Sequence, residues 1–172
     1  MLEEEIVKAG AFKLGDFTLA SGRKSDYYVD LRSVTTRPEL LKKVAKAMAG
    51  HVGKCDRIAG VELGAVPIAA ALSLETGIPF LMVRKQRKGH GTGNLVEGNM
   101  LSGDSVVFVE DTVTTAGSLV RAINAVRERG GIVKKAIVIV DREEGAGEAL
   151  TGIGVEMVSV ASIRKLRACA KA

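Results

Sequence analysis

Four short apolar runs, separated by segments of helical periodicity, constrain the fold of this chain more than any other feature. The runs are rich in β-branched residues and apolar on both faces, as expected of parallel strands that helices cover on each side. They are Arg57–Val61, Pro79–Val83, Ser105–Val109 and Lys135–Val140. A fifth segment, Val155–Val160, alternates between apolar and polar residues, which predicts an edge strand.

Helical patterns lie between these runs. Pro38 is predicted to open the first of them, since proline is favoured at the first position of a helix. Two more are predicted over residues 66–75 and 118–128, and each is followed by a glycine suited to ending a helix, Gly77 and Gly130. Strand and helix in alternation predict an α/β fold with a mostly parallel, twisted sheet flanked by helices.

The first 35 residues have a different pattern. A short helix is predicted over residues 2–9, followed by two small strands at 17–19 and 27–31. We interpret this part as a hood over the carboxyl end of the sheet. The whole chain, 1–172, has the size of one domain and is predicted to be a single one.

The composition excludes several classes of protein. The apolar runs are much shorter than the ~18 residues of a membrane span, and the acidic start, Met1–Glu5, differs from a signal peptide, so we expect a soluble, cytoplasmic protein. The net charge of +5 favours a polyanionic partner, but aromatic residues at 3% offer little for stacking on bases. We therefore expect a small polyanionic ligand, with no nucleic acid and no membrane as partner.

Two adjacent carboxylates, Glu110 and Asp111, follow the third apolar run. Small and hydroxyl residues come next, and a helix is predicted to begin at Ser118. In open α/β sheets, ligands bind beyond the carboxyl ends of the strands. Free N–H groups at a helix start attract a phosphate, and the hydroxyls of Thr114 and Thr115 add donors. The carboxylates then suit ribose hydroxyls or Mg²⁺, so the segment predicts a sugar-phosphate site. The competing interpretation is a capped helix beside two solvated acids.

A basic, glycine-rich loop follows the second apolar run, over residues 84–98. Its four cations and His90 are interleaved with glycines. A loop of this length without secondary structure of its own is typically mobile or functional. Closing over a diphosphate requires such cations, and His90 beside Lys85 and Lys88 is suited to donate a hydrogen bond to a departing oxygen. The alternative is a solvated basic hairpin tip.

The segment Glu110–Ser118 resembles the motif with which type I phosphoribosyltransferases bind PRPP, 5-phosphoribosyl 1-diphosphate. Three further stretches resemble the orotate phosphoribosyltransferase family, and its archaeal members in particular. They are Phe17–Asp30, Arg84–Gly91 and Val140–Gly145, in the family's order. The resemblance therefore covers most of the chain and implies the type I phosphoribosyltransferase fold with an N-terminal hood.

The same resemblance implies an activity. The enzyme would transfer the phosphoribosyl group from PRPP to orotate, giving orotidine 5′-monophosphate and diphosphate in UMP biosynthesis. It would use Mg²⁺ held mainly by PRPP, without dedicated protein ligands. It would be a homodimer in which Arg84, Lys88 and His90 reach the neighbouring subunit's site. Two alternatives stay open: salvage of another base by the same machinery, and a PRPP-binding regulator without catalysis.

Roles for individual residues are also implied by the resemblance. Lys85, together with Arg84, Lys88 and His90, would act on the diphosphate as the catalytic group. Orotate would be held by Arg142 and Thr114, with Tyr28 of the hood near the base. In two places, Ala20 and Gly64, many bacterial members have a lysine. The PRPP-binding residues would be Glu110, Asp111, Thr112, Val113, Thr114, Thr115, Ala116, Gly117 and Ser118.

Overall fold

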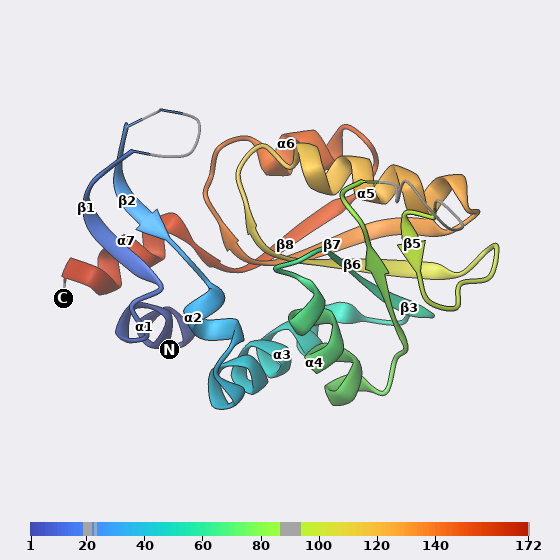
Figure 1. Ribbon diagram of the computed structural model, residues 1–172, viewed down its shortest axis with the longest axis horizontal. Helices are drawn as coiled ribbons and strands as arrows, with labels where there is room; N and C mark the ends of the chain where they lie inside the picture. The colour runs from blue at the N-terminus through green and yellow to red at the C-terminus, as the bar shows by residue number, and fades with distance from the viewer. Residues whose placement is uncertain (19–21, 23, 87–93, 172) are drawn as a thin grey trace.

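In the computed structural model, which describes residues 1–18, 22, 24–86 and 94–171, a six-stranded sheet forms the centre of the molecule (Figure 1). In spatial order its strands are β5 (Val96–Glu97), β4 (Phe80–Val83), β3 (Arg57–Val61), β6 (Ser105–Val113), β7 (Ile132–Asp141) and β8 (Glu156–Ser162). All neighbours pair in parallel except β4 with β5. The predicted α/β fold with a mostly parallel sheet is confirmed, and β8 lies at an edge, as predicted.

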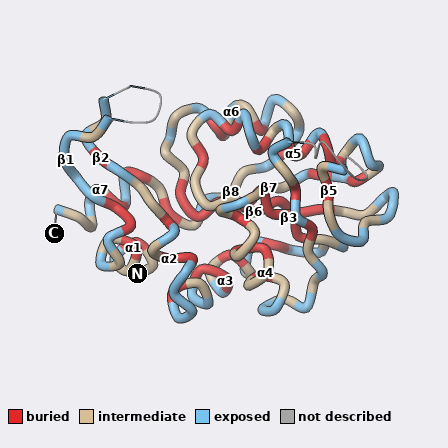
Figure 2. The backbone as a smooth tube through the Cα atoms, viewed as in Figure 1, coloured by how far each residue is buried: buried red, intermediate tan, exposed pale blue. Residues whose placement is uncertain are grey.

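Helices cover both faces of this sheet (Figure 1). On one face lie α3 (Pro38–Val52) and α4 (Val66–Thr76), and on the other α5 (Gly117–Glu128) and α6 (Ala146–Thr151). Side chains of a strand alternate between the two layers. Val107 and Val109 belong to the apolar cluster that includes α3 and α4, whereas Val106 and Phe108 belong to the cluster that includes α5 and α6. The buried positions accordingly follow the sheet and the inner sides of the helices (Figure 2).

The hood is built from both ends of the chain. Its elements are α1 (Leu2–Lys8), the antiparallel pair β1 (Phe12–Thr18) and β2 (Lys24–Val29), the short helix α2 (Arg32–Thr35) and the C-terminal helix α7 (Ile163–Lys171). Helix α7 packs against α1 and β1 (Figure 1). Ile6, Phe12 and Tyr27 of the hood belong to the same buried cluster as Ile137 of the central sheet.

The structure differs from the predicted elements in several respects. The helices α2, α6 and α7 and the short strand β5 were not predicted, and β1 begins at Phe12 and not at Phe17. The hood includes α7 and not only the first 35 residues. Strand β6 ends at Val113 and not at Val109, because it keeps pairing with β7 past that point. In the described part of the chain, no helix is long and apolar enough to cross a membrane.

Candidate active site

The end of β6 is open on one side because β3 pairs with a shorter part of it than β7 does. β3 pairs with β6 only as far as Val109, which lies opposite Gly60. β7 continues alongside as far as Val113, which lies opposite Asp141. The last four residues of β6 therefore pair with a strand on one side only. The two predicted carboxylates belong to these four residues, and both are half-buried.

The predicted phosphate loop and the first turn of α5 line a cavity of about 290 Å³. Ala116 is the N-cap and has left-handed backbone angles, with φ at 58°. The amide of Val120 bonds the Ala116 carbonyl at 2.8 Å. The amides of Gly117, Ser118 and Leu119 come before it and have no acceptor inside the helix. These donors, at the positive end of the helix dipole, suit a phosphate.

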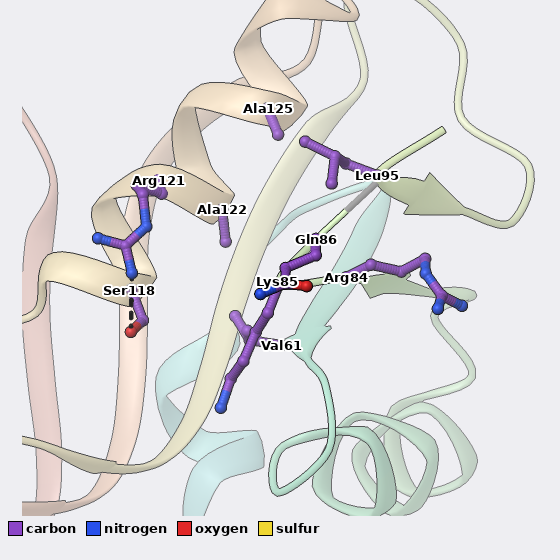
Figure 3. Close-up of a pocket in the computed structure, with 9 residues that line it drawn as sticks. All are labelled: Val61, Arg84, Lys85, Gln86, Leu95, Ser118, Arg121, Ala122 and Ala125. Carbon is purple, nitrogen blue, oxygen red and sulfur yellow. Dashed lines mark hydrogen bonds between the residues drawn. The ribbon is translucent and has the colours of Figure 1, made fainter. Parts of the chain in front are cut away.

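Arg121 lines the same cavity, one turn further along α5, and was not predicted to take part. Its Nη2 donates to the Ser118 hydroxyl oxygen at 3.4 Å. It also lines a neighbouring cavity of about 300 Å³ that extends to Arg84 and Lys85 (Figure 3). The three-residue spacing from Ser118 places both side chains on one face of the helix, so this position could have been found from the sequence.

The two carboxylates lie close enough to disturb each other. Burial, and then the charge of Asp111, raise the pKa of Glu110 to about 8, and Lys85 acts in the opposite direction. The carboxylate of Asp111 accepts the amide of Thr112 at 2.6 Å. It also lies where a Cβ atom at Gly64 would be, so the absence of a side chain at this position leaves room for it. Burial and the neighbouring charge therefore favour the protonated form of Glu110 in the free protein.

The base of the predicted catalytic loop is fixed between β4 and β5. The amide of Arg84 bonds the Leu95 carbonyl at 2.7 Å, and the amide of Lys85 bonds Glu62 Oε1 at 2.7 Å. Arg84 Nη2 is 3.9 Å from the Glu62 carboxylate, and its buried Nε has no hydrogen-bond partner in the described part of the protein. Figure 3 shows the Arg84 and Lys85 side chains pointing in different directions from this base. Lys88 and His90 lie outside the described residues.

Arg142 lies directly beside the phosphate loop. Its amide bonds the Val113 carbonyl at 3.0 Å, which joins the ends of β7 and β6. Its guanidinium is largely buried and contacts two side chains: Nε donates to the Tyr27 hydroxyl at 2.9 Å, and Nη2 lies 3.0 Å from Glu144. These three residues and Lys24 help line a cavity of about 380 Å³ under the hood.

Tyr27, which was not predicted to take part, is the tyrosine that contacts Arg142, whereas Tyr28, predicted to lie near the base, belongs to the other face of β2. Successive residues of β2 point to opposite faces, so the two rings are separated. Tyr28 is 38% exposed, and its ring lies 5.6 Å from that of Phe17. Sequence alternation indicates that the two tyrosines differ, but it does not tell which one faces the sheet.

Similarity to known proteins agrees with this geometry. A family model described as phosphoribosyl transferase domain matches residues 30–154. The orotate phosphoribosyltransferase of Methanothermobacter thermautotrophicus is 51% identical over 149 residues, covering 87% of this chain and 83% of that protein. That of Methanocaldococcus jannaschii is 47% identical, with 93% and 92% covered. The chain belongs to the orotate phosphoribosyltransferase family.

Solved structures of orotate phosphoribosyltransferases have the same fold. The crystal structure of the enzyme from Aeropyrum pernix is 38% identical, with a TM-score of 0.88 and 96% of each chain covered. Adenine phosphoribosyltransferase from Leishmania tarentolae is 17% identical, with a TM-score of 0.71, and shares the fold alone. The resemblance on which the sequence prediction rested is confirmed.

The raised pKa of Glu110 predicts how the stability of the protein responds to pH. Between about pH 4.5 and 8 the folded protein keeps a proton that the unfolded chain has released, so the free energy of unfolding falls as pH rises through this window. Glu110→Gln removes this dependence. We expect the melting temperature of the variant to rise relative to the wild type between pH 5 and pH 8.5, by roughly 2–4 °C per kcal/mol.

Thermal unfolding at pH 5, 7 and 8.5 measures this difference. Glu128→Gln serves as the control. It changes an exposed glutamate at the C-terminal end of α5 and should follow the wild type at each pH. A constant difference between Glu110→Gln and the wild type would mean that Glu110 ionises in the ordinary range.

Proposed function

We propose that this chain transfers the phosphoribosyl group of PRPP to orotate, giving orotidine 5′-monophosphate and diphosphate in pyrimidine biosynthesis. The observation that carries the proposal is the convergence of an anion-binding helix start, two carboxylates and an arginine at the ends of two neighbouring strands. A related orotate phosphoribosyltransferase from Mycobacterium tuberculosis, 31% identical with a TM-score of 0.81, has been crystallised in complex with PRPP.

PRPP would be held at both ends of its ribose. The amides and hydroxyls of residues 114–118 bind the 5′-phosphate at the start of α5. Glu110 and Asp111 accept hydrogen bonds from the ribose hydroxyls. Positive charge that arrives with the substrate lowers the pKa of Glu110 and favours its ionised, accepting form. This arrangement leaves the anomeric carbon facing the base, with the diphosphate toward the loop after β4.

The reaction displaces diphosphate from the anomeric carbon. N1 of orotate forms the new bond as the C1–O bond breaks, and the leaving diphosphate keeps the electron pair. The proton of N1 is released to water or to the diphosphate. Negative charge on the diphosphate is stabilised by Lys85, together with Arg84, Lys88 and His90 from the loop that reaches over from the neighbouring subunit. The unpartnered Nε of Arg84 supports this role, because a buried donor is expected to find an acceptor when the substrate is bound.

Mg²⁺ is proposed to enter with PRPP. In the described part of the chain, no group of three or more metal-binding side chains is close enough to form a cage. Mg²⁺ usually binds one or two carboxylates together with substrate phosphates and water, and the oxygens of Glu110 and Asp111 fit that preference. When bound, the ion neutralises charge on the diphosphate.

Orotate recognition is assigned to Arg142 and Thr114, with Tyr28 of the hood at the edge of the base. A guanidinium binds a carboxylate through two parallel hydrogen bonds, which selects orotate over bases that lack this group. The neighbouring strand ends support a common site for these groups, since the Arg142 amide bonds the residue that precedes Thr114. Both substrates are charged metabolites, so we propose a cytoplasmic location.

A homodimer is supported by the outer face of α4. Pro67, Ala70, Ala71 and Leu74 follow helical spacing on the side away from the buried Ile68 and Leu72. Leu74 is 90% exposed, which is unusual for a leucine inside a helix that is apolar all round. We propose that a second copy covers this face and that the loop after β4 then reaches the neighbouring site.

Loss of the Lys85 side chain should abolish most turnover while the protein stays folded. Lys85→Ala is expected to lower kcat by about 10²–10³, the usual cost of removing one group that stabilises developing charge. The measurement is the loss of orotate ultraviolet absorbance in the presence of PRPP and Mg²⁺. Lys54→Ala, an exposed lysine at the opposite end of the sheet, is the matched control.

Two outcomes of this assay would contradict the proposals. If the wild-type protein consumes no orotate with PRPP and Mg²⁺ present, the function is wrong. If it consumes orotate and Lys85→Ala keeps near-normal turnover, the base of the loop has no part in the mechanism.

Leu74→Glu should separate the subunits, because it buries an uncompensated charge at the proposed contact. Light scattering after size exclusion is expected to give a dimer for the wild type and a monomer for the variant, with activity lost in parallel. Leu101→Glu, at another leucine that is 68% exposed, should remain dimeric. An active wild-type monomer would refute the dimer.

A further inference from the structure

Tyr27 lies between two arginines that come from distant parts of the chain. Its ring is buried, with 8% of the residue exposed. The guanidinium carbon of Arg142 lies 5.0 Å from the ring centroid, and that of Arg167 lies 4.7 Å from it. The ring of Phe12 stacks at 5.9 Å. These contacts fix the position of the ring, since each guanidinium is attracted to its π-electrons.

The hydroxyl of Tyr27 completes a closed network with Arg142 and Glu144. It accepts the Nε–H of Arg142 at 2.9 Å and donates to Glu144 Oε1 at 3.3 Å. Glu144 Oε1 in turn lies 3.0 Å from Arg142 Nη2. One edge of the guanidinium is therefore occupied by Tyr27 and Glu144. The other edge, formed by Nη1 and the second N–H of Nη2, offers two parallel donors to a substrate carboxylate.

Arg167 connects this network to the C-terminal helix. Its two terminal nitrogens bond the two oxygens of Asp26 at 2.7 and 2.6 Å, in the bidentate geometry that is strongest for this pair. Asp26 directly precedes Tyr27 in β2. Arg167 of α7 thus holds β2 in two ways, although it is 140 residues from Tyr27 in the sequence. It forms an ion pair with Asp26, and its guanidinium lies over the Tyr27 ring.

We propose that Tyr27 is a positioning residue for orotate recognition, holding the Arg142 guanidinium at the angle its carboxylate partner requires, and that Arg167 of α7 holds Tyr27 in that place. The proposal rests on the proposed function of Arg142. A two-bond contact with a carboxylate depends on the orientation of the guanidinium plane, and an arginine free to rotate loses part of this contact.

Tyr27→Phe tests the proposal with little disturbance, because it keeps the ring and removes only the hydroxyl. Losing one hydrogen bond to a charged group is expected to raise the KM for orotate about tenfold. The KM for PRPP should stay unchanged. With uracil, which is the same ring without the carboxylate, kcat/KM should also stay unchanged, so discrimination between the two bases falls about tenfold.

Arg167→Ala should give the same pattern, and Arg167→Lys an intermediate one, since lysine keeps the charge but not the planar fork. Lys165→Ala, on the same helix and paired with Glu3, is the control and should behave as the wild type. A merely structural role of α7 would lower kcat/KM for orotate and uracil alike.

Arg142→Ala, measured in parallel, separates this inference from the proposed function. If Arg142→Ala loses discrimination while Tyr27→Phe keeps it, Tyr27 does not position Arg142 and the proposed function stands. If Arg142→Ala also keeps discrimination, the assignment of Arg142 to the base fails, and the positioning role falls with it.

Discussion

The pairing of β6 with β7 beyond the reach of β3 is the interaction on which the site depends. It holds the carboxylates on one strand end and Arg142 on the next, and a single bond from the Arg142 amide to the Val113 carbonyl closes the ladder. The open side of β6 gives a ligand access to the carboxylates. The phosphate loop, the loop after β3 and the base of the loop after β4 all lie around this one overhang.

The electrostatics of the free protein follow from that arrangement. Burial raises the pKa of Glu110, and the neighbouring charge of Asp111 raises it further, so the free protein favours the protonated form of Glu110. Lys85 is the cation that acts on Glu110, and its backbone amide is held by the Glu62 carboxylate. PRPP would bring Mg²⁺ and ribose hydroxyls to the two acids. These groups would offset the loss of stability that the two acids cause in the free protein. Groups that lower stability for this reason are typical of active sites.

Much of the fold was predictable because periodicity reports burial directly. The strand Arg57–Val61 was predicted to the residue, and the helix starting at Pro38 has its proline where expected. The extension of β6 was not predicted, since Glu110 and Asp111 are uncommon inside a strand and its pairing partner is distant in sequence. Helix α7 is short and basic, and its place in the hood depends on contacts with the other end of the chain.

The part of the candidate site that could be predicted is the part whose residues are consecutive in the sequence. The segment 110–118 forms its cavity from one strand, one turn and one helix start, so a local pattern identifies it. Tyr27 and Arg167 became visible only in three dimensions, because they act through Arg142 and are separated from it by at least 25 residues. Gly64 likewise matters through its distance to Asp111, which no spacing in the sequence indicates.

Amide hydrogen exchange with and without PRPP and Mg²⁺ tests the central claim most directly, because the sheet offers two competing ends. A further hollow of about 420 Å³, lined by Cys55, Ser105 and Lys134 among others, lies at the amino ends of β3, β6 and β7. We expect slower exchange in residues 110–119 and at the base of the loop after β4, with no change at residues 52–55 and 132–135. Protection at the amino ends of the strands instead, or no protection at residues 114–118, would contradict a substrate site at the carboxyl end of β6.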